Sequence, residues 1–245
     1  MLIKRPIPVQ TFLDYADSRL KMFLNQKNEQ RLLDKQRTHE AMKATFIAAD
    51  EFNLLFETRD DVAVLHDLRI GIEGASAHID HLFITNNMQI FIVESRLAIK
   101  QLELQQDHRC LSNAGSSDTC EIPSPIEQLK RNRQMLKKVF RKIGLPTRFG
   151  QTLVPTLHCF VALDPYSLMS NKLGRSHEYF VSPEQLVALI NEHTKGQNIL
   201  NFFTRLPAED LKNIASKIAR FHSTKDVRFS NKFRHILVPP TIHAP

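Results

Sequence analysis

The chain of 245 residues has no tryptophan, only seven glycines and only three cysteines. Scarce glycine and absent tryptophan argue against a repeat chain or a collagen-like chain, in which every third residue is glycine. The cysteines, Cys110, Cys120 and Cys159, are odd in number and include no Cys-x-x-Cys pair. This pattern disfavours a disulfide framework and a structural zinc site. Reduced thiols in a cytosolic protein are the simplest interpretation.

The sequence also lacks any long apolar run. No run approaches the roughly 18 residues of a membrane span. The basic start, residues 1–6, is not followed by the apolar core of a signal peptide. We therefore expect a soluble, cytoplasmic protein without a membrane partner. Its hydrophobic content of 42% suffices for a real core, and its formal net charge of +7 favours a polyanionic partner such as nucleic acid.

Two short apolar runs carry the most informative residues of the chain. They cover residues 78–84 and 89–96, and the polar segment between them, residues 85–87, predicts a turn. Each run has one carboxylate where burial is expected, Asp80 in the first and Glu94 in the second. An unpaired buried carboxylate is very costly, so each of these acids predicts a compensating cation nearby.

The nature of that cation leaves two interpretations open. If the runs pair as a hairpin, Asp80 and Glu94 lie on neighbouring strands, close enough to share Mg²⁺ or Mn²⁺. Glu94 and Arg96 are two residues apart and project from the same strand face. A metal there would polarise a phosphoryl oxygen, while Arg96 would stabilise the charge of the transition state. Alternatively, the acids form structural salt bridges with Arg96 or Arg69.

Two other metal-ligand sets are less favourable. His78 and His81 are three residues apart, so they lie on opposite faces of a strand and disfavour a histidine-ligated metal. Cys110 and Cys120 with His108 could bind zinc, but their spacing and ligand number are poor.

The order of expected elements predicts an α/β (α+β) fold with a mixed sheet flanked by helices. Residues 11–56 contain no proline or glycine and are rich in helix formers. We expect a helical N-terminal extension (1–43), a core domain (44–195), and a C-terminal helix with a basic tail (196–245). A strand meander followed by a crossover gives a mixed sheet. The expected elements after the N-terminal helix are strands at 62–70, 78–84, 89–96 and 102–106, a loop at 107–124, a helix at 125–143, strands at 153–163 and 179–181, and helices at 182–192 and 208–221.

The helix expected over residues 125–143 has a one-sided charge pattern. Leu129, Leu136 and Phe140 fall on one side, and no acid occurs from residue 129 to residue 148. Cations opposite the apolar stripe would contact phosphates and steer nucleic acid, with DNA as the expected form, but would read little sequence. The plain alternative is a solvated face. The candidate nucleic-acid-binding residues are Lys130, Arg131, Arg133, Lys137, Lys138 and Arg141.

These motifs together resemble the nuclease-related domain family, NERD, which is placed by similarity in the PD-(D/E)xK nuclease superfamily. The resemblance covers roughly residues 46–190. It implies a restriction-endonuclease-like core and Mg²⁺-dependent hydrolysis of phosphodiester bonds in DNA. The residues that carry it are Val-Leu-His-Asp at 64–67, Ile-Asp-His-Leu at 79–82, Ile-Val-Glu-Ser-Arg at 92–96 and Pro-Ile-Glu-Gln at 125–128.

Taken position by position, the resemblance implies five catalytic residues. Glu51 matches an acidic residue on the helix before the sheet, where it would assist catalysis. Asp80 and Glu94 match the metal-binding pair. Gln128 matches a polar residue on the following helix that would position water or phosphate. Arg96 stands where the family usually has lysine.

The departure at Arg96 leaves the function open. Arginine is effectively always charged and is a poor general base, whereas a buried lysine can lose its proton. The leading hypothesis is a metal-dependent deoxyribonuclease, and the alternative is a catalytically degenerate nucleic-acid-binding module on the same fold. Lys100, six residues beyond Glu94, is an alternative cation for the site, and Asp50 stands where the family commonly has glycine. A third hypothesis is an interaction scaffold that forms a homo-oligomer through its polar N-terminal helix.

Overall fold

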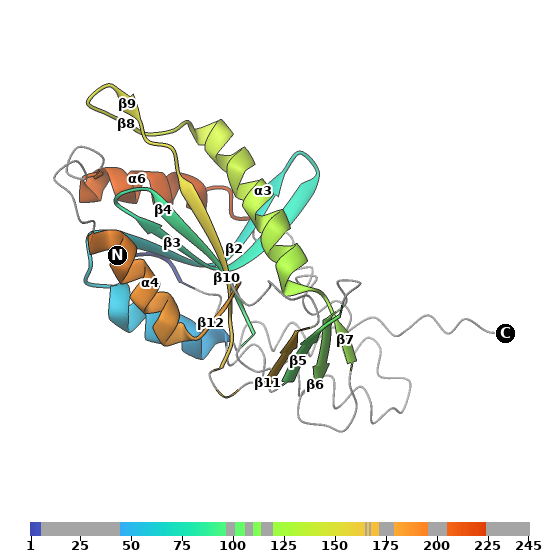
Figure 1. Cartoon of the computed structure of the whole chain (residues 1–245). Helices are drawn as coiled ribbons and strands as arrows, with labels where there is room; N and C mark the ends of the chain where they lie inside the picture. Colours follow the sequence, from blue (N-terminus) through green and yellow to red (C-terminus); the bar gives the residue numbers. More distant parts are fainter. Residues whose placement is uncertain are drawn as a thin grey trace, which may run out of the picture.

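The computed structural model describes residues 1–5, 45–96, 101–105, 110–113, 120–164, 166, 168–171, 179–195 and 205–223. Its main body is a six-stranded mixed sheet with the strand order β1-β2-β3-β4-β10-β12 (Figure 1). β2, β3 and β4 form an antiparallel meander, whereas β1, β10 and β12 join their neighbours in parallel. The fold is therefore the mixed α/β architecture predicted from the sequence. The strands are β1 Leu2–Lys4, β2 Val62–Ile72, β3 Ala75–Thr85, β4 Gln89–Ser95, β10 Thr156–Ala162 and β12 Phe180–Val181.

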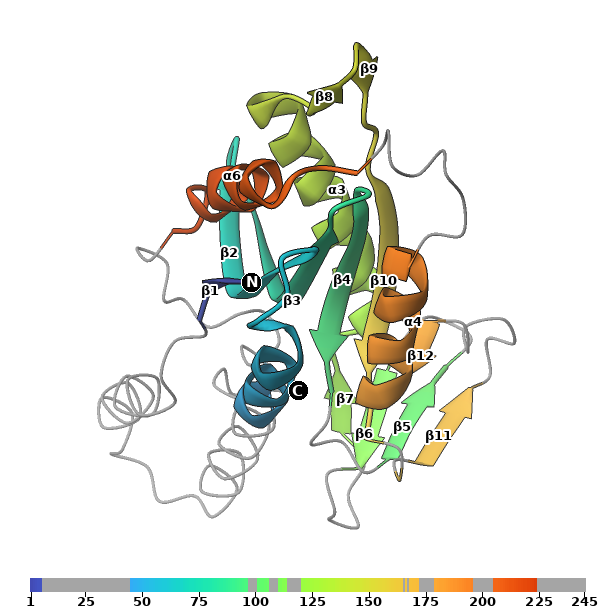
Figure 2. The same ribbon diagram turned by 90° about the vertical axis from the view of Figure 1, so that its left-hand side faces the viewer.

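Helices cover both faces of this sheet (Figure 2). α3 (Pro125–Ile143) and α6 (Ala208–Ala219) contribute buried residues to one core. A helix over residues 45–56 and α4 (Pro183–Lys195) contribute to a second core on the other face. Successive residues of a strand point to opposite faces, so neighbours such as Ile92 and Val93 belong to different cores.

The local sequence accounts for the bounds of α3. Ser124 precedes the helix, and its Oγ accepts a hydrogen bond from the backbone N–H of Glu127 at 3.4 Å. Pro125 occupies the first turn, where a missing N–H has no partner to lose. The helix ends at Gly144, whose φ of +77° suits glycine. Leu136, from the predicted apolar stripe, is fully buried against the sheet.

A second, four-stranded sheet contains the order β11-β5-β6-β7. Two of its strands lie within residues 107–124, so the expectation of a loop there was wrong. The polar composition of this segment gave no signal for these strands: β6 forms by pairing with β5, and β7 forms by pairing with β6. The strands are β5 Gln101–Leu104, β6 Cys110–Asn113, β7 Cys120–Ile122 and β11 Leu168–Asn171.

Two further short elements were not expected from the sequence. β1 lies in the supposedly irregular lead-in and pairs with β2. β8 (Thr147–Arg148) and β9 (Gln151–Thr152) form a hairpin that follows α3. Figure 1 shows this hairpin beyond the C-terminal end of α3.

The predicted terminal segments are described only in part. α6, from the expected C-terminal segment, packs on the main sheet, and the backbone N–H of Ser223 donates to the carbonyl of Arg69 at 2.9 Å. Most of the expected N-terminal extension, including the polar helix proposed for self-association, lies outside the described residues. Across the described ranges, no helix combines the length and apolar character that a bilayer crossing requires.

Candidate functional site

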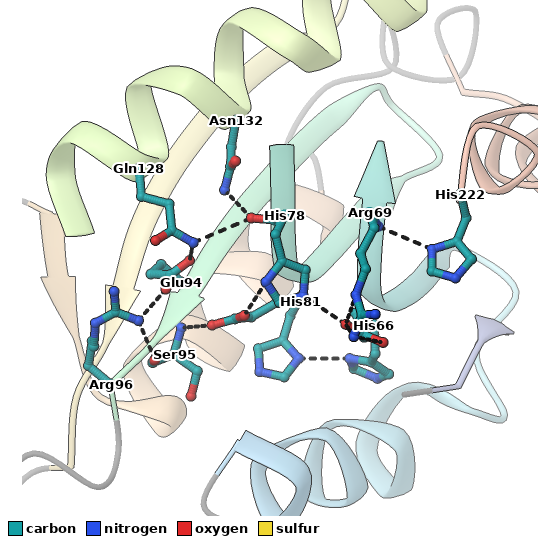
Figure 3. A network of polar contacts seen from close by, with 12 residues as sticks. His66, Arg69, His78, His81, Glu94, Ser95, Arg96, Gln128, Asn132 and His222 are labelled. Carbon is teal, nitrogen blue, oxygen red and sulfur yellow. Dashed lines mark hydrogen bonds and ion pairs between the residues drawn. The ribbon is translucent and has the colours of Figure 1, made fainter. Parts of the chain in front are cut away.

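The expected hairpin places the two acids on neighbouring strands. β3 and β4 pair with His81 opposite Val93, and continuing this antiparallel register sets Asp80 opposite Glu94. Both acids are buried, with exposed fractions of 3% and 0%. The backbone N–H of Ser95 donates to Asp80 Oδ2 at 2.8 Å, so the residue after Glu94 holds the other acid (Figure 3).

Glu94 is compensated by donors from two different elements. The guanidinium Nη1 of Arg96 donates to Glu94 Oε1, and Arg96 itself is only 5% exposed. Gln128, in the first turns of α3, donates from Nε2 to Glu94 Oε2 at 2.6 Å. Both oxygens of this carboxylate therefore accept hydrogen bonds from the protein. The structural salt bridge considered from the sequence is present between Glu94 and Arg96.

Asp80 adjoins a second group of charges that extends across β2. The ring of His78 lies between two acids, with Nδ1 3.6 Å from Asp80 Oδ1 and Nε2 2.7 Å from Asp67 Oδ1. Arg69 pairs with Asp67 at 3.1 Å, and Lys4 Nζ lies 4.0 Å from it. Burial raises the pKa of Asp67, but the hydrogen bond from His78 and the nearby cations outweigh it and lower that pKa to about 2. Asp67 is therefore ionised and holds His78 beside Asp80.

α3 connects the two groups of charges. The backbone carbonyl of His78 accepts from Gln128 Nε2 at 3.4 Å and from Asn132 Nδ2 at 2.7 Å (Figure 3). Gln128 thus bridges β3 and β4, since it also holds Glu94. Its Oε1 is buried and has no hydrogen-bond partner among the described residues.

Glu51, the fifth predicted catalytic residue, has a different environment. It is exposed on the helix of residues 45–56, whereas Asp80 and Glu94 are buried. That helix packs through Phe52 on the face of the sheet opposite α3. Lys100, the alternative cation, lies outside the described residues.

The residues as arranged do not fit a divalent ion. Mg²⁺ prefers near-octahedral oxygen ligands, usually carboxylates and water. Both oxygens of Glu94 already hold donors from Arg96 and Gln128. Within the described ranges, no group of three His, Cys, Asp or Glu side chains could hold a metal. An ion between Asp80 and Glu94 would require Arg96 to move away.

A buried histidine pair, not anticipated from the sequence, lies beside this network. His66 and His81 are cross-strand partners whose Nδ1 atoms are 2.8 Å apart, and His66 Nε2 lies 3.0 Å from Asn53 Oδ1. Burial and the neighbouring His81 lower the pKa of His66 to about 2, so His66 is neutral near pH 7. The pair follows from the register in which β2 pairs with β3. The residues around His66 and those around His81 do not specify that register when each segment is considered alone.

The predicted basic surface is exposed on α3. Lys130 pairs with Glu127 at 2.7 Å, and Lys142 pairs with Glu73 at 3.1 Å. Lys138 also lies 3.9 Å from Glu73. Four other exposed cations have no carboxylate partner within the described ranges, and we call them the cationic face: Arg131, Arg133, Lys137 and Arg141.

The chain matches a known family over half of its length. A family model described as "Nuclease-related domain", NERD, matches residues 40–162, just over half of the chain. This range contains all five predicted catalytic residues and the whole of α3. No curated protein and no solved structure matches the chain.

Proposed function

Because the chain belongs to the nuclease-related domain family, we propose that it binds nucleic acid, with DNA as the expected form, along the exposed face of α3. In this proposal the buried acids of β3 and β4, Asp80 and Glu94, stabilise the fold, and the domain is a binding module without a working metal centre. The observation that carries it is the ion pair between Glu94 and Arg96, which gives one of the expected metal ligands a cation from the protein.

The chemistry of Arg96 supports a structural role. A guanidinium keeps its proton at any physiological pH and binds carboxylates through a planar set of donors. Arg96 is nearly buried beside Glu94, so its charge compensates that carboxylate without a metal ion. A guanidinium is also a poor general base, the role for which a lysine of lowered pKa is suited.

The cationic face supports nucleic-acid binding. It runs along the same helix that holds Glu94 through Gln128, and none of its four members has an acidic partner within the described ranges. Lysine and arginine side chains bind phosphates and release counterions, so such binding weakens steeply as salt rises. Contacts of this kind position the protein on the backbone and carry little sequence information.

Fluorescence anisotropy with labelled DNA tests this function. We expect the protein to bind single-stranded and duplex oligonucleotides in EDTA, with an affinity that falls linearly on a logarithmic salt scale. The same affinity with and without Mg²⁺ supports a binding module. Absence of binding at low salt, or binding that strictly requires Mg²⁺, overturns the proposal.

Metal-dependent hydrolysis of DNA is the second candidate, favoured by two observations. Asp80 and Glu94 lie on the paired strands β3 and β4, each next to the last residue pair of the register, His81 and Val93, and the buried Oε1 of Gln128 has no hydrogen-bond partner among the described residues. Asp80 and Glu94 would hold Mg²⁺ or Mn²⁺, and Glu51 would assist. This function requires Arg96 to leave Glu94, which is why we rank it second.

Cleavage assays separate the two candidates. Plasmid and single-stranded DNA are incubated with Mg²⁺, Mn²⁺ or EDTA, using the native protein and the variants Arg96→Lys and Asp80→Asn. We expect no cleavage by the native protein; cleavage gained in Arg96→Lys would identify a degenerate centre. Divalent-dependent cleavage that is lost in Arg96→Lys would show that Arg96 is functional. Any activity that persists unchanged in Asp80→Asn does not come from this site.

A further inference from the structure

The β8–β9 hairpin presents an aromatic side chain to solvent. Thr147 pairs with Thr152 and Arg148 with Gln151, which leaves Phe149 and Gly150 as a two-residue turn. Phe149 is 68% exposed at this turn. An exposed phenylalanine at the tip of a hairpin contributes little to a core, so its presence calls for another explanation.

The backbone of the turn makes this phenylalanine more unusual. Phe149 has φ of +48° and Gly150 has φ of +78°. Two successive positive φ values are typical of a type I′ turn, which favours Asn-Gly. A bulky residue with positive φ is uncommon and strained. Strain of this kind concentrates at functional sites, so the outlier points to a role for the ring.

One cation lies over this aromatic ring, and two more are in the helical turn that precedes the hairpin. The guanidinium carbon of Arg148 lies 5.1 Å from the centroid of the Phe149 ring. The last turn of α3, which precedes the hairpin, carries Arg141 and Lys142. Exposed aromatic rings among cations are typical of proteins that bind single-stranded nucleic acid, where bases stack on the rings and cations contact phosphates.

We propose that Phe149 stacks on an unpaired nucleobase of a strand whose phosphates follow the cationic face of α3. This inference rests on the proposed function and adds the type of nucleic acid. α3 has 19 residues and is about 28 Å long, and its C-terminal end leads to the β8–β9 hairpin (Figure 1). Bases inside a duplex are stacked on both sides, whereas an unpaired base offers an open face to the ring.

The absence of tryptophan from the chain allows a direct test. Phe149→Trp introduces a single fluorophore at the turn, and Leu54→Trp is a matched control. Leu54 is 81% exposed on the helix of residues 45–56, which packs on the opposite face of the sheet. We expect a single-stranded oligonucleotide to quench the tryptophan fluorescence of Phe149→Trp, with the same titration midpoint as the anisotropy of labelled DNA. The tryptophan fluorescence of Leu54→Trp should not change.

A second variant separates binding from folding. Phe149→Asn gives the turn its preferred Asn-Gly sequence, so the protein should resist urea at least as well as the native chain. We expect its affinity for single-stranded DNA to fall roughly tenfold, because one stacked base is lost. Affinity for a blunt duplex should change far less.

The outcomes distinguish failure of this inference from failure of the proposed function. If the native protein binds DNA with the expected salt dependence, but Phe149→Trp is not quenched and Phe149→Asn binds normally, the stacking role is wrong and the binding function stands. Equal losses for the single strand and the duplex also contradict base stacking. If the native protein binds neither form, both proposals are overturned.

Discussion

The two ends of α3 use charge in opposite ways. At the N-terminal end, Gln128 contacts the buried Glu94, whose charge is compensated by Arg96. Toward the C-terminal end, Lys137 and Arg141 are exposed, with no carboxylate partner in the described ranges. Compensated buried charges hold strands and helix in place, while exposed cations are available to a partner. One helix therefore joins a structural region to the surface that we propose for binding.

This difference predicts different responses to mutation. Removing one member of a buried ion pair costs about 3–5 kcal/mol, because a charge is left without compensation. Exposed ion pairs contribute only about 0–1 kcal/mol. Substitutions at the buried end should therefore change the free energy of unfolding, and those at the exposed end should change nucleic-acid affinity.

The largest expected effect is that of Arg96→Met. The substitution leaves Glu94 buried without its cation, so we expect the free energy of unfolding to fall by about 3–5 kcal/mol. Urea denaturation measures this loss. The double variant Arg96→Met/Glu94→Gln removes both charges and should recover most of the stability. A loss below about 1 kcal/mol in the single variant would show that the pair behaves like an exposed one.

The pH dependence of stability sharpens the comparison, because His66 lies in the buried region. The pKa of His66 is about 2 in the folded protein, whereas the ordinary pKa of a histidine, which applies to the unfolded chain, is 6.5. As the pH falls below 6.5, the unfolded chain binds a proton that the folded protein does not, so stability is lost toward low pH. The loss is about 1.4 kcal/mol per pH unit from this histidine.

Urea denaturation at about pH 7 and about pH 5 checks this effect, to which His66 should contribute about 2 kcal/mol. His222, whose pKa is lowered to about 4 chiefly by burial, adds a loss in the same direction. The control is His66→Asn, in which the pH dependence should be smaller. Asp67, with its pKa lowered from 3.8 to about 2, adds a further loss only below about pH 4. Binding through arginine and lysine should stay nearly constant over this range. An equal pH dependence in His66→Asn would show that other groups carry it.

The features predictable from the sequence are those with a local signal. Two short apolar runs with a polar turn between them indicated the β3–β4 hairpin and hence the neighbouring strands of Asp80 and Glu94. Helical spacing and the prolyl start indicated α3, with Leu136 buried and Lys137 exposed, as the structure has them. Each of these signals lies within about 20 residues of chain.

The features that the sequence did not predict depend on distant partners. Asp67 meets His78 and His66 meets His81 only because β2 and β3 pair in one particular register. β6 forms by pairing with β5, and β7 by pairing with β6, although the composition of both is that of a loop. The contact of Arg96 with Glu94 was foreseen as one of two alternatives, since spacing alone does not specify which group compensates the acid.

A pair of matched charge variants examines the exposed end of α3. Lys137→Gln/Arg141→Gln removes two members of the cationic face, and Lys212→Gln/Lys217→Gln removes two exposed cations from α6. We expect the first variant to bind DNA about tenfold more weakly and to reduce the slope of its salt dependence by about two. The second variant should change the affinity and the slope much less, and both variants should keep the urea midpoint of the native protein. Equal losses would indicate net charge, not a defined surface.

The smallest expected effect concerns Glu73, the acid beside the cationic face. Glu73 lies in the β2–β3 turn, where it pairs with Lys142 at 3.1 Å and lies 3.9 Å from Lys138. Glu73→Gln removes the acid and makes two more cations available to phosphates, so affinity should rise on the order of twofold, with a steeper salt dependence.

The same variant should leave the urea midpoint unchanged, because the Glu73 side chain is exposed. Anisotropy measures the nucleic-acid affinity of this variant, and urea denaturation of the same preparation measures its stability. Weaker binding in Glu73→Gln would mean that Glu73 positions Lys138 and Lys142 for the nucleic acid. The ion pair would then be part of the binding surface. An acid would hold cations in position at this end of α3, as Glu94 and Arg96 hold each other at the other end.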